Sequence, residues 1–113
     1  MDLMLELDNY QEIFQKAYGY NIPYELVDKD DNPIDITGCT LVKFYASSAT
    51  DELVKYSGNM VVDNAALGLV HYSPIISDFI TSGKFDVEIW VTFAAKRLIF
   101  GKIILLCLKS RGS

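Results

Sequence analysis

Residues 83–93 read Gly-Lys-Phe-Asp-Val-Glu-Ile-Trp-Val-Thr-Phe, and their side chains alternate in character along the chain. The odd-numbered residues from Phe85 to Phe93 are all apolar, whereas Asp86, Glu88 and Thr92 between them are polar. Successive side chains of an extended strand point to opposite faces, so a period of two predicts a strand with one buried face. Trp90 falls on the other face, with the polar residues.

The same period recurs along most of the chain. It predicts further strands over residues 20–27, 39–46, 53–56, 60–62, 67–72 and 98–108, and a first strand around Leu3, Leu5 and Leu7. Seven or eight short strands separated by turn residues are typical of a sandwich or a barrel, so we expect an all-β fold. Pro23 places the strand over residues 20–27 at a sheet edge, because proline cannot donate to a neighbour.

Two segments are ambiguous. Residues from Asp8 to Gly19 fit either a short helix or a second strand. Residues 73–80 begin with Ser73-Pro74 and have apolar side chains at helical spacing, which predicts one helical turn between strands.

The length of 113 residues and a hydrophobic content of 50% predict a single domain with a core of its own. We assign residues 1–110 to this domain and interpret Arg111-Gly112-Ser113 as a remnant of an expression vector. Cys39 and Cys107 are the only cysteines and lie in apolar runs, so we expect both to be free. One histidine and two distant cysteines predict no metal site, and no cofactor motif is present.

The net charge of −5 argues against two classes of partner. Nucleic acid is bound through clustered Lys and Arg, and an anionic membrane surface also attracts basic residues. The longest apolar run, Leu98–Leu108, is too short to span a bilayer, which takes about 20 residues. We therefore expect no nucleic acid and no membrane, and a protein as the partner.

Candidate catalytic residues are few. Asp28, Asp30 and Asn32 resemble the start of a calcium loop, but Pro33 stands where such a loop needs glycine, so a solvated turn is the favoured interpretation. His71 is the only histidine and would have to serve any triad mechanism. Asp86 and Glu88 share one strand face and resemble a carboxylate pair, but without a sugar-binding cleft a solvated face is the favoured interpretation. We expect no enzymatic activity.

The strongest indication of a partner is apolar surface with no place in a single core. Trp90 lies on the face opposite the apolar face of its strand, where it meets a partner or, if the strand is central, another part of the same chain. Residues 98–108 are apolar on both faces. The candidate interface residues are Trp90, Tyr45, Tyr56, Tyr72, Phe100 and Ile104. The pattern predicts a homo-oligomer or a complex with another protein.

Residues 24–44 read YELVDKDDNPIDITGCTLVKF, in which a strand leads into an Asp-rich turn with Pro-Ile-Asp-Ile-Thr-Gly and then into a second strand. This stretch resembles the N-terminal domain of phage upper-baseplate proteins, where a strand, an Asp-rich turn reading Pro-Ile-Asp-Leu-Thr-Gly and a strand reading Val-x-Phe follow in the same order. Residues 62–72, VDNAALGLVHY, and residues 83–93 are similar to its hairpin and long strand. The resemblance implies an immunoglobulin-like antiparallel β-sandwich that carries no catalytic residues. It also implies other virion or tail proteins as partners, and the host cytoplasm during assembly and then the virion as location.

Two functions follow as expectations. The first is a non-enzymatic structural or assembly module of a phage tail or baseplate. The alternative is a monomeric recognition module that binds a host protein or a surface glycan through the face around Trp90. The mass of the protein in solution distinguishes them.

Overall fold

The computed structural model describes residues 11–75, 78–79 and 81–109. Every regular element in this part of the chain is a β-strand, which confirms the predicted all-β fold. The strands are β1 (Gln11–Phe14), β2 (Ile22–Glu25), β3 (Leu41–Ser48), β4 (Val54–Asn59), β5 (Val61–Asn64), β6 (Leu69–Tyr72), β7 (Gly83–Thr92) and β8 (Arg97–Leu108). The strand predicted around Leu3 to Leu7 and the vector remnant at residues 111–113 lie outside the described residues.

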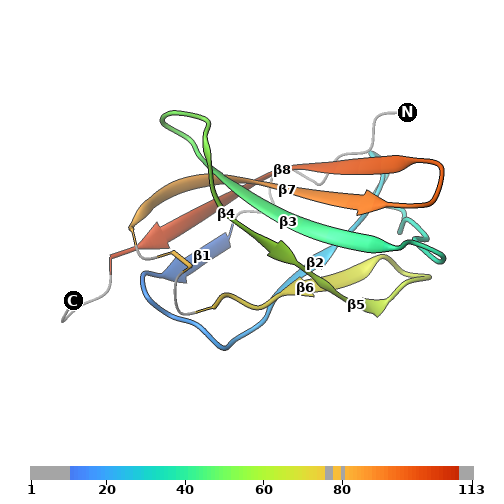
Figure 1. Ribbon diagram of the computed structural model, residues 1–113, viewed down its shortest axis with the longest axis horizontal. Helices are drawn as coiled ribbons and strands as arrows, with labels where there is room; N and C mark the ends of the chain where they lie inside the picture. Colours follow the sequence, from blue (N-terminus) through green and yellow to red (C-terminus); the bar gives the residue numbers. More distant parts are fainter. Residues whose placement is uncertain (1–10, 76–77, 80, 110–113) are drawn as a thin grey trace.

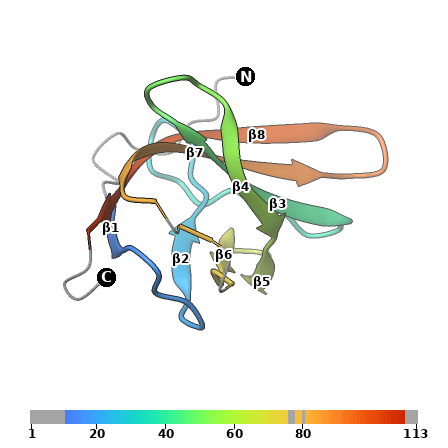
Figure 2. The same cartoon turned by 60° about the vertical axis from the view of Figure 1, so that its left-hand side comes forward.

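The strands form two layers (Figure 1). One sheet has the order β1-β8-β7-β3-β4 and the other the order β2-β6-β5 within the described residues. Turned by 60°, the molecule shows the smaller sheet beneath the larger one (Figure 2). The long strands β7 and β8 give the molecule its elongated shape, with extents of 44 × 24 × 21 Å.

The larger sheet is mixed, which corrects the expectation of a purely antiparallel sandwich. β1 pairs with the end of β8 in parallel, from Gln11 opposite Leu105 to Phe14 opposite Leu108. Residues 11–14 are therefore strand, which decides for these residues the ambiguity over Asp8–Gly19. The other strand pairs of residues 11–109 that the structure describes are antiparallel.

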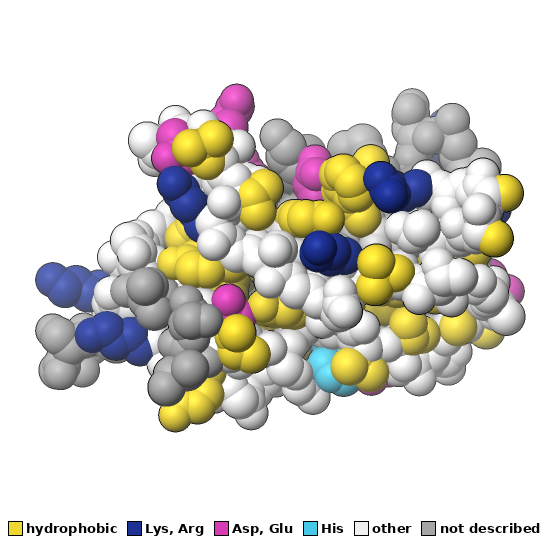
Figure 3. All heavy atoms as spheres, in the orientation of Figure 1, with side chains coloured by type: hydrophobic (Ala, Val, Ile, Leu, Met, Phe, Trp, Pro, Cys, Tyr) yellow, Lys and Arg dark blue, Asp and Glu magenta, His cyan; other side chains and the backbone are white. Residues whose placement is uncertain are grey.

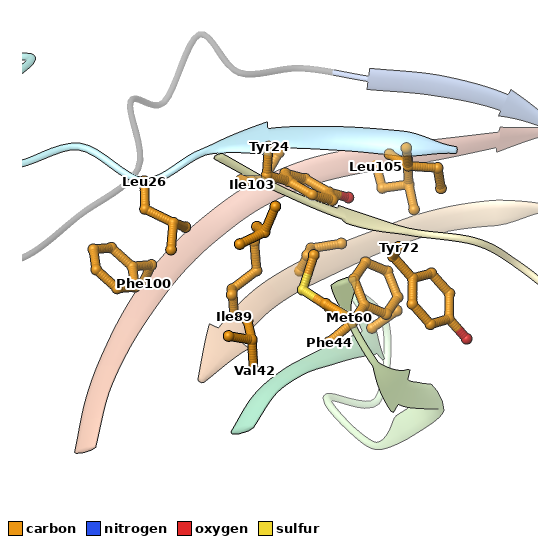
Figure 4. Close-up of a cluster of buried hydrophobic side chains, with 14 of the residues drawn as sticks. Tyr24, Leu26, Val42, Phe44, Met60, Tyr72, Ile89, Phe100, Ile103 and Leu105 are labelled. Atoms are coloured by element: carbon orange, nitrogen blue, oxygen red, sulfur yellow. The ribbon is translucent and has the colours of Figure 1, made fainter. Parts of the chain in front are cut away.

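The core lies between the sheets and consists of the inward side chains of both (Figure 4). Phe44 of β3 is fully buried, and its ring stacks on Tyr72 of β6 with centroids 4.1 Å apart. Phe85, Val87, Ile89 and Val91 of β7 are buried as the period of two predicted. Removing such side chains from water is the main favourable contribution to folding.

The segment between β6 and β7 contains a turn where a helical turn was expected. The amide of Asp78 donates to the carbonyl of Ile75 at 2.8 Å, which closes one turn. No helix is present among the described residues. Residues 76, 77 and 80 of this segment lie outside the described part.

The sequence predicts that a partner covers the two apolar faces of β8, but part of the cover comes from the chain itself. The second half of β8 lies between β7 and β1. Phe100, Ile103, Leu105 and Cys107 face the core, whereas Ile104, Leu106 and Leu108 are half-buried on the other face. Both apolar faces of this strand are thus partly covered within the one chain.

Two smaller predictions are confirmed. β2 with Pro23 lies at the edge of the three-stranded sheet within the described residues, and Cys39 and Cys107 are free. No helix of the described residues is long and apolar enough to cross a membrane.

Candidate functional site

The outer face of the larger sheet carries the most distinctive group of side chains. The strand registers arrange it in four rows across β3, β7 and β8. The rows are Leu41-Thr92-Arg97, Lys43-Trp90-Ile99, Tyr45-Glu88-Gly101 and Ser47-Asp86-Ile104. We call these twelve residues the outer face. Their side chains lie on the same side of the sheet because every second residue of a strand projects on that side.

Trp90 occupies the middle of this face and is held from three sides. Its indole Nε1–H donates to Glu88 Oε1 at 3.1 Å. The ring of Tyr45 lies 4.9 Å away between centroids, and the guanidinium of Arg97 lies 5.0 Å from the centre of the indole ring. A half-buried aromatic ring fixed in this way loses little side-chain entropy when it meets a partner.

Apolar and basic side chains surround the tryptophan. Ile99 is 44% exposed and Leu41 is 40% exposed. The ammonium group of Lys43 lies 5.4 Å from the centre of the Tyr45 ring. Figure 3 shows hydrophobic side chains next to basic ones over the strands of the larger sheet. Tryptophan, tyrosine and arginine are the residue types that dominate the energetics of protein interfaces.

The candidate interface residues from the sequence fall into three groups. Trp90, Tyr45 and Ile104 belong to the outer face. Tyr56 is half-buried on the inner side, where its ring lies 4.7 Å from that of Phe79. Tyr72 and Phe100 are 4% and 0% exposed in the core, so their expected place at an interface is wrong.

A β-bulge explains the error at Phe100. The register between β7 and β8 shifts between Val87 and Glu88, which pair with Ile103 and Gly101 respectively. The extra residue on β8 reverses the alternation, so Phe100 and Ile104 point to opposite faces although their numbers differ by four. An uninterrupted period of two would have placed them together.

In the acidic turn, the carboxylate of Asp28 accepts hydrogen bonds from the backbone of the turn itself. Asp28 Oδ1 accepts hydrogen bonds from the amides of Asp30 at 2.8 Å and Asn32 at 3.0 Å. The hydrogen bond from the Asn32 amide is the main reason that the pKa of Asp28 lies below its usual value. This is the behaviour of a turn that Asp stabilises, and it supports the interpretation as a solvated turn.

His71 is paired with a residue that the sequence analysis did not single out. Its Nδ1 lies 2.8 Å from both carboxylate oxygens of Asp63. The two residues stand on neighbouring strands, β6 and β5, where a register shift brings Asp63 close. No nucleophile of the described residues hydrogen-bonds the other ring nitrogen, which a triad mechanism would require.

The carboxylate pair Asp86 and Glu88 lines a shallow hollow of about 290 Å³ together with Ser47 and Glu52. Within the described residues, no group of three or more His, Cys, Asp or Glu is arranged to hold a metal ion. The hollow thus gives the outer face an acidic end, opposite the end that carries Lys43 and Arg97.

A buried carboxylate was also missed. Asp78 is 5% exposed and accepts hydrogen bonds from the Tyr72 hydroxyl at 2.5 Å and from the Ile75 amide at 3.0 Å. It anchors the crossing segment to β6. Nothing in the local sequence marks it, because its burial depends on a contact with a neighbouring strand.

Comparison with models of known protein families finds no match, and no curated protein is significantly similar to the chain. The resemblance to the phage upper-baseplate domain therefore stays a prediction that depends on the residues quoted for it.

Proposed function

We propose that the chain is a structural or assembly module of a phage tail or baseplate that acts through protein–protein contacts and catalyses no reaction. The observation that carries the proposal is the outer face, with a fixed tryptophan between exposed apolar side chains and charges of both signs. Such a composition is typical of surfaces that bind proteins.

We further propose that the sandwich is immunoglobulin-like, and the strand order supports this. If β2 to β8 are lettered B, C, C′, D, E, F and G, the sheets read G-F-C-C′ and B-E-D. These are the orders of a variable-type immunoglobulin domain. The fold that the resemblance implies is thus compatible with the topology, although fold alone does not decide function.

The turn that carries much of the resemblance has a structural part in this fold. Asp35 Oδ1 accepts a hydrogen bond from the Thr37 amide at 2.9 Å, and Gly38 follows with a φ of 88°. Only glycine adopts such a backbone conformation at little cost. The Pro-Ile-Asp-Ile-Thr-Gly stretch therefore turns the chain from one sheet toward the other.

Immunogold labelling of purified virions tests the proposal. Antibodies against the folded chain are applied to particles of the phage that encodes it. Gold at the tail tip is the expected result. A chain that is abundant in the lysate but never found on particles would contradict a role in the virion.

The alternative of a recognition module has one observation in its favour. A hollow of about 330 Å³ is lined by Tyr56, Lys55 and Lys84 together with several hydroxyl-bearing side chains. An aromatic ring beside hydroxyl and ammonium groups suits a glycan. Titration with a panel of surface glycans, followed by NMR, would support this function if the amide signals of these residues shift, and would exclude it for that panel if they do not.

A further inference from the structure

The charges of the outer face are separated along the strands. The rows Leu41-Thr92-Arg97 and Lys43-Trp90-Ile99 carry both cations, whereas the rows Tyr45-Glu88-Gly101 and Ser47-Asp86-Ile104 carry both carboxylates. Glu52 adds a third carboxylate at the acidic end, where it lines the hollow with Asp86. Lys84 stands one row farther along β7, at the periphery of the face.

From this pattern we propose that the outer face binds the outer face of a second copy of the same chain. The two-fold axis lies in the interface between the larger sheets of the two copies and runs perpendicular to their strands. This inference rests on the proposed function and names its surface and partner. A rotation about that axis reverses the strand direction, so the basic end of each copy faces the acidic end of the other. A two-fold axis parallel to the strands would set like charges against each other, which is costly.

The shape of the face fits the same axis. If the axis passes between the two middle rows, Ile99 of one copy lies over Gly101 of the other, because both residues belong to β8. Ile99 is 44% exposed, and Gly101 has no side chain. An exposed apolar side chain thus lies over a glycine at two equivalent places, beside the Glu88 side chain, whose Cγ lies 3.1 Å from where a Cβ of Gly101 would stand. The fixed indoles of Trp90 lie near the centre.

The charged side chains then pair across the axis. The row of Arg97 faces the row of Asp86, and the row of Lys43 faces that of Glu88. Sheets that pack face to face keep their strands within about 30° of each other, so these rows remain close despite the twist. Each contact occurs twice, since the interface is isologous.

Reciprocal charge reversal tests the proposal. In Asp86→Lys the introduced cation meets Arg97 of the second copy, and in Arg97→Glu the introduced anion meets Asp86. Light scattering is expected to show a dimer for the wild type and a dimer dissociation constant at least tenfold higher for each variant. A mixture of the two variants in equal amounts is expected to recover the dimer, because every charged contact in the mixed pair is again between opposite signs.

Native mass spectrometry identifies the mixed dimer by its mass. Glu25→Lys, on the exposed face of β2, and Lys29→Glu, in the acidic turn, make the same charge changes elsewhere and serve as controls. Both controls are expected to dimerise like the wild type. Circular dichroism of each variant confirms that its fold is retained.

Three outcomes would overturn the inference: a wild type that is monomeric at every concentration, variants that dimerise as well as the wild type, or a mixture that stays monomeric. The proposed function is tested separately, by the labelling of virions, and does not depend on these three outcomes. A monomer that labels the tail tip would leave that function standing, whereas a dimer absent from virions would leave only the interface.

Discussion

At the scale of single residues, the hydroxyl groups of two core tyrosines differ in their hydrogen bonding. The Tyr72 hydroxyl donates to the buried carboxylate of Asp78. The Tyr24 hydroxyl is also buried, yet it has no hydrogen-bond partner among the described residues. Losing one member of a buried pair is costly, whereas removing a buried polar group that has no partner is not.

Replacing each tyrosine by phenylalanine is therefore expected to give different results. Tyr72→Phe leaves Asp78 with one donor fewer and lowers the free energy of unfolding by about 1–3 kcal/mol. Tyr24→Phe leaves it unchanged or raises it. Urea denaturation measures both, and equal losses for the two variants would contradict the hydrogen-bond assignment.

The same hydroxyls predict a loss of stability at high pH. Burial, followed for Tyr72 by its hydrogen bond to Asp78, raises the pKa of Tyr24 and Tyr72 above the ordinary value of 10.0. The unfolded chain therefore releases these protons at a lower pH than the folded protein. Below about pH 10 the two hydroxyls leave the free energy of unfolding unchanged, because they are protonated in both states. As the pH rises above 10, the unfolded chain loses these protons first and the free energy of unfolding decreases.

Urea denaturation between about pH 8 and pH 11 measures this decrease. The double variant Tyr24→Phe/Tyr72→Phe should show a flatter decline above pH 10 than the wild type. An identical decline in both proteins would mean that these hydroxyls titrate normally in the folded state.

At the scale of the elements, one glycine controls the approach of the hairpin β5–β6 to the β2 side of the sandwich. Gly68 has a φ of 66°, and its carbonyl accepts the amide of Leu26 at 2.9 Å. A Cβ atom there would lie 2.7 Å from the Ile34 carbonyl oxygen and 2.8 Å from that of Leu26. Backbone atoms cannot move aside as the end of a side chain does.

Gly68→Ala is therefore expected to lower the free energy of unfolding by more than about 2 kcal/mol, from left-handed strain and overpacking together. Gly38→Ala is the matched control, since its φ is 88° but a Cβ would meet nothing within 4 Å. It should cost only the strain, about 1–2 kcal/mol. Chemical denaturation of both variants measures the difference, and equal effects would contradict the steric part.

The strands themselves could be predicted from local sequence, because their period of two is a local property. The face to which each side chain points could be predicted only where no bulge intervenes, as in β7. The bulge at Lys102 and the sheet face to which Tyr72 points depend on pairing with distant strands. Phe100 and Tyr72 were therefore expected at an interface although they are buried in the core. The parallel pairing of β1 with β8 joins residues far apart in the chain and had no local signal.

At the scale of the whole molecule, the two sheets have different outer surfaces. The larger sheet carries the aromatic residues Tyr45 and Trp90 between separated charges. The three-stranded sheet carries the exposed Val61 and the paired His71 and Asp63. Of the predicted interface residues, Trp90, Tyr45 and Ile104 lie on this outer face; Tyr45 and Trp90 could be assigned to it from the sequence, because the other face of their strands is apolar.

Trp90→Ala is expected to raise the dissociation constant of the dimer at least tenfold, as for other central aromatic residues of interfaces. Val61→Ala, on the other sheet, should leave it unchanged. Sedimentation velocity over a dilution series measures both constants. A dimer that tolerates the loss of Trp90 but not of Val61 would place the interface on the other sheet.

The most direct test of the central claim is the absolute mass of the wild-type chain, measured by size-exclusion chromatography with light scattering across a range of concentrations. A two-fold interface predicts twice the chain mass of 12.7 kDa, and a dimer that persists on dilution into the micromolar range. A mass of one chain at every concentration would contradict the claim.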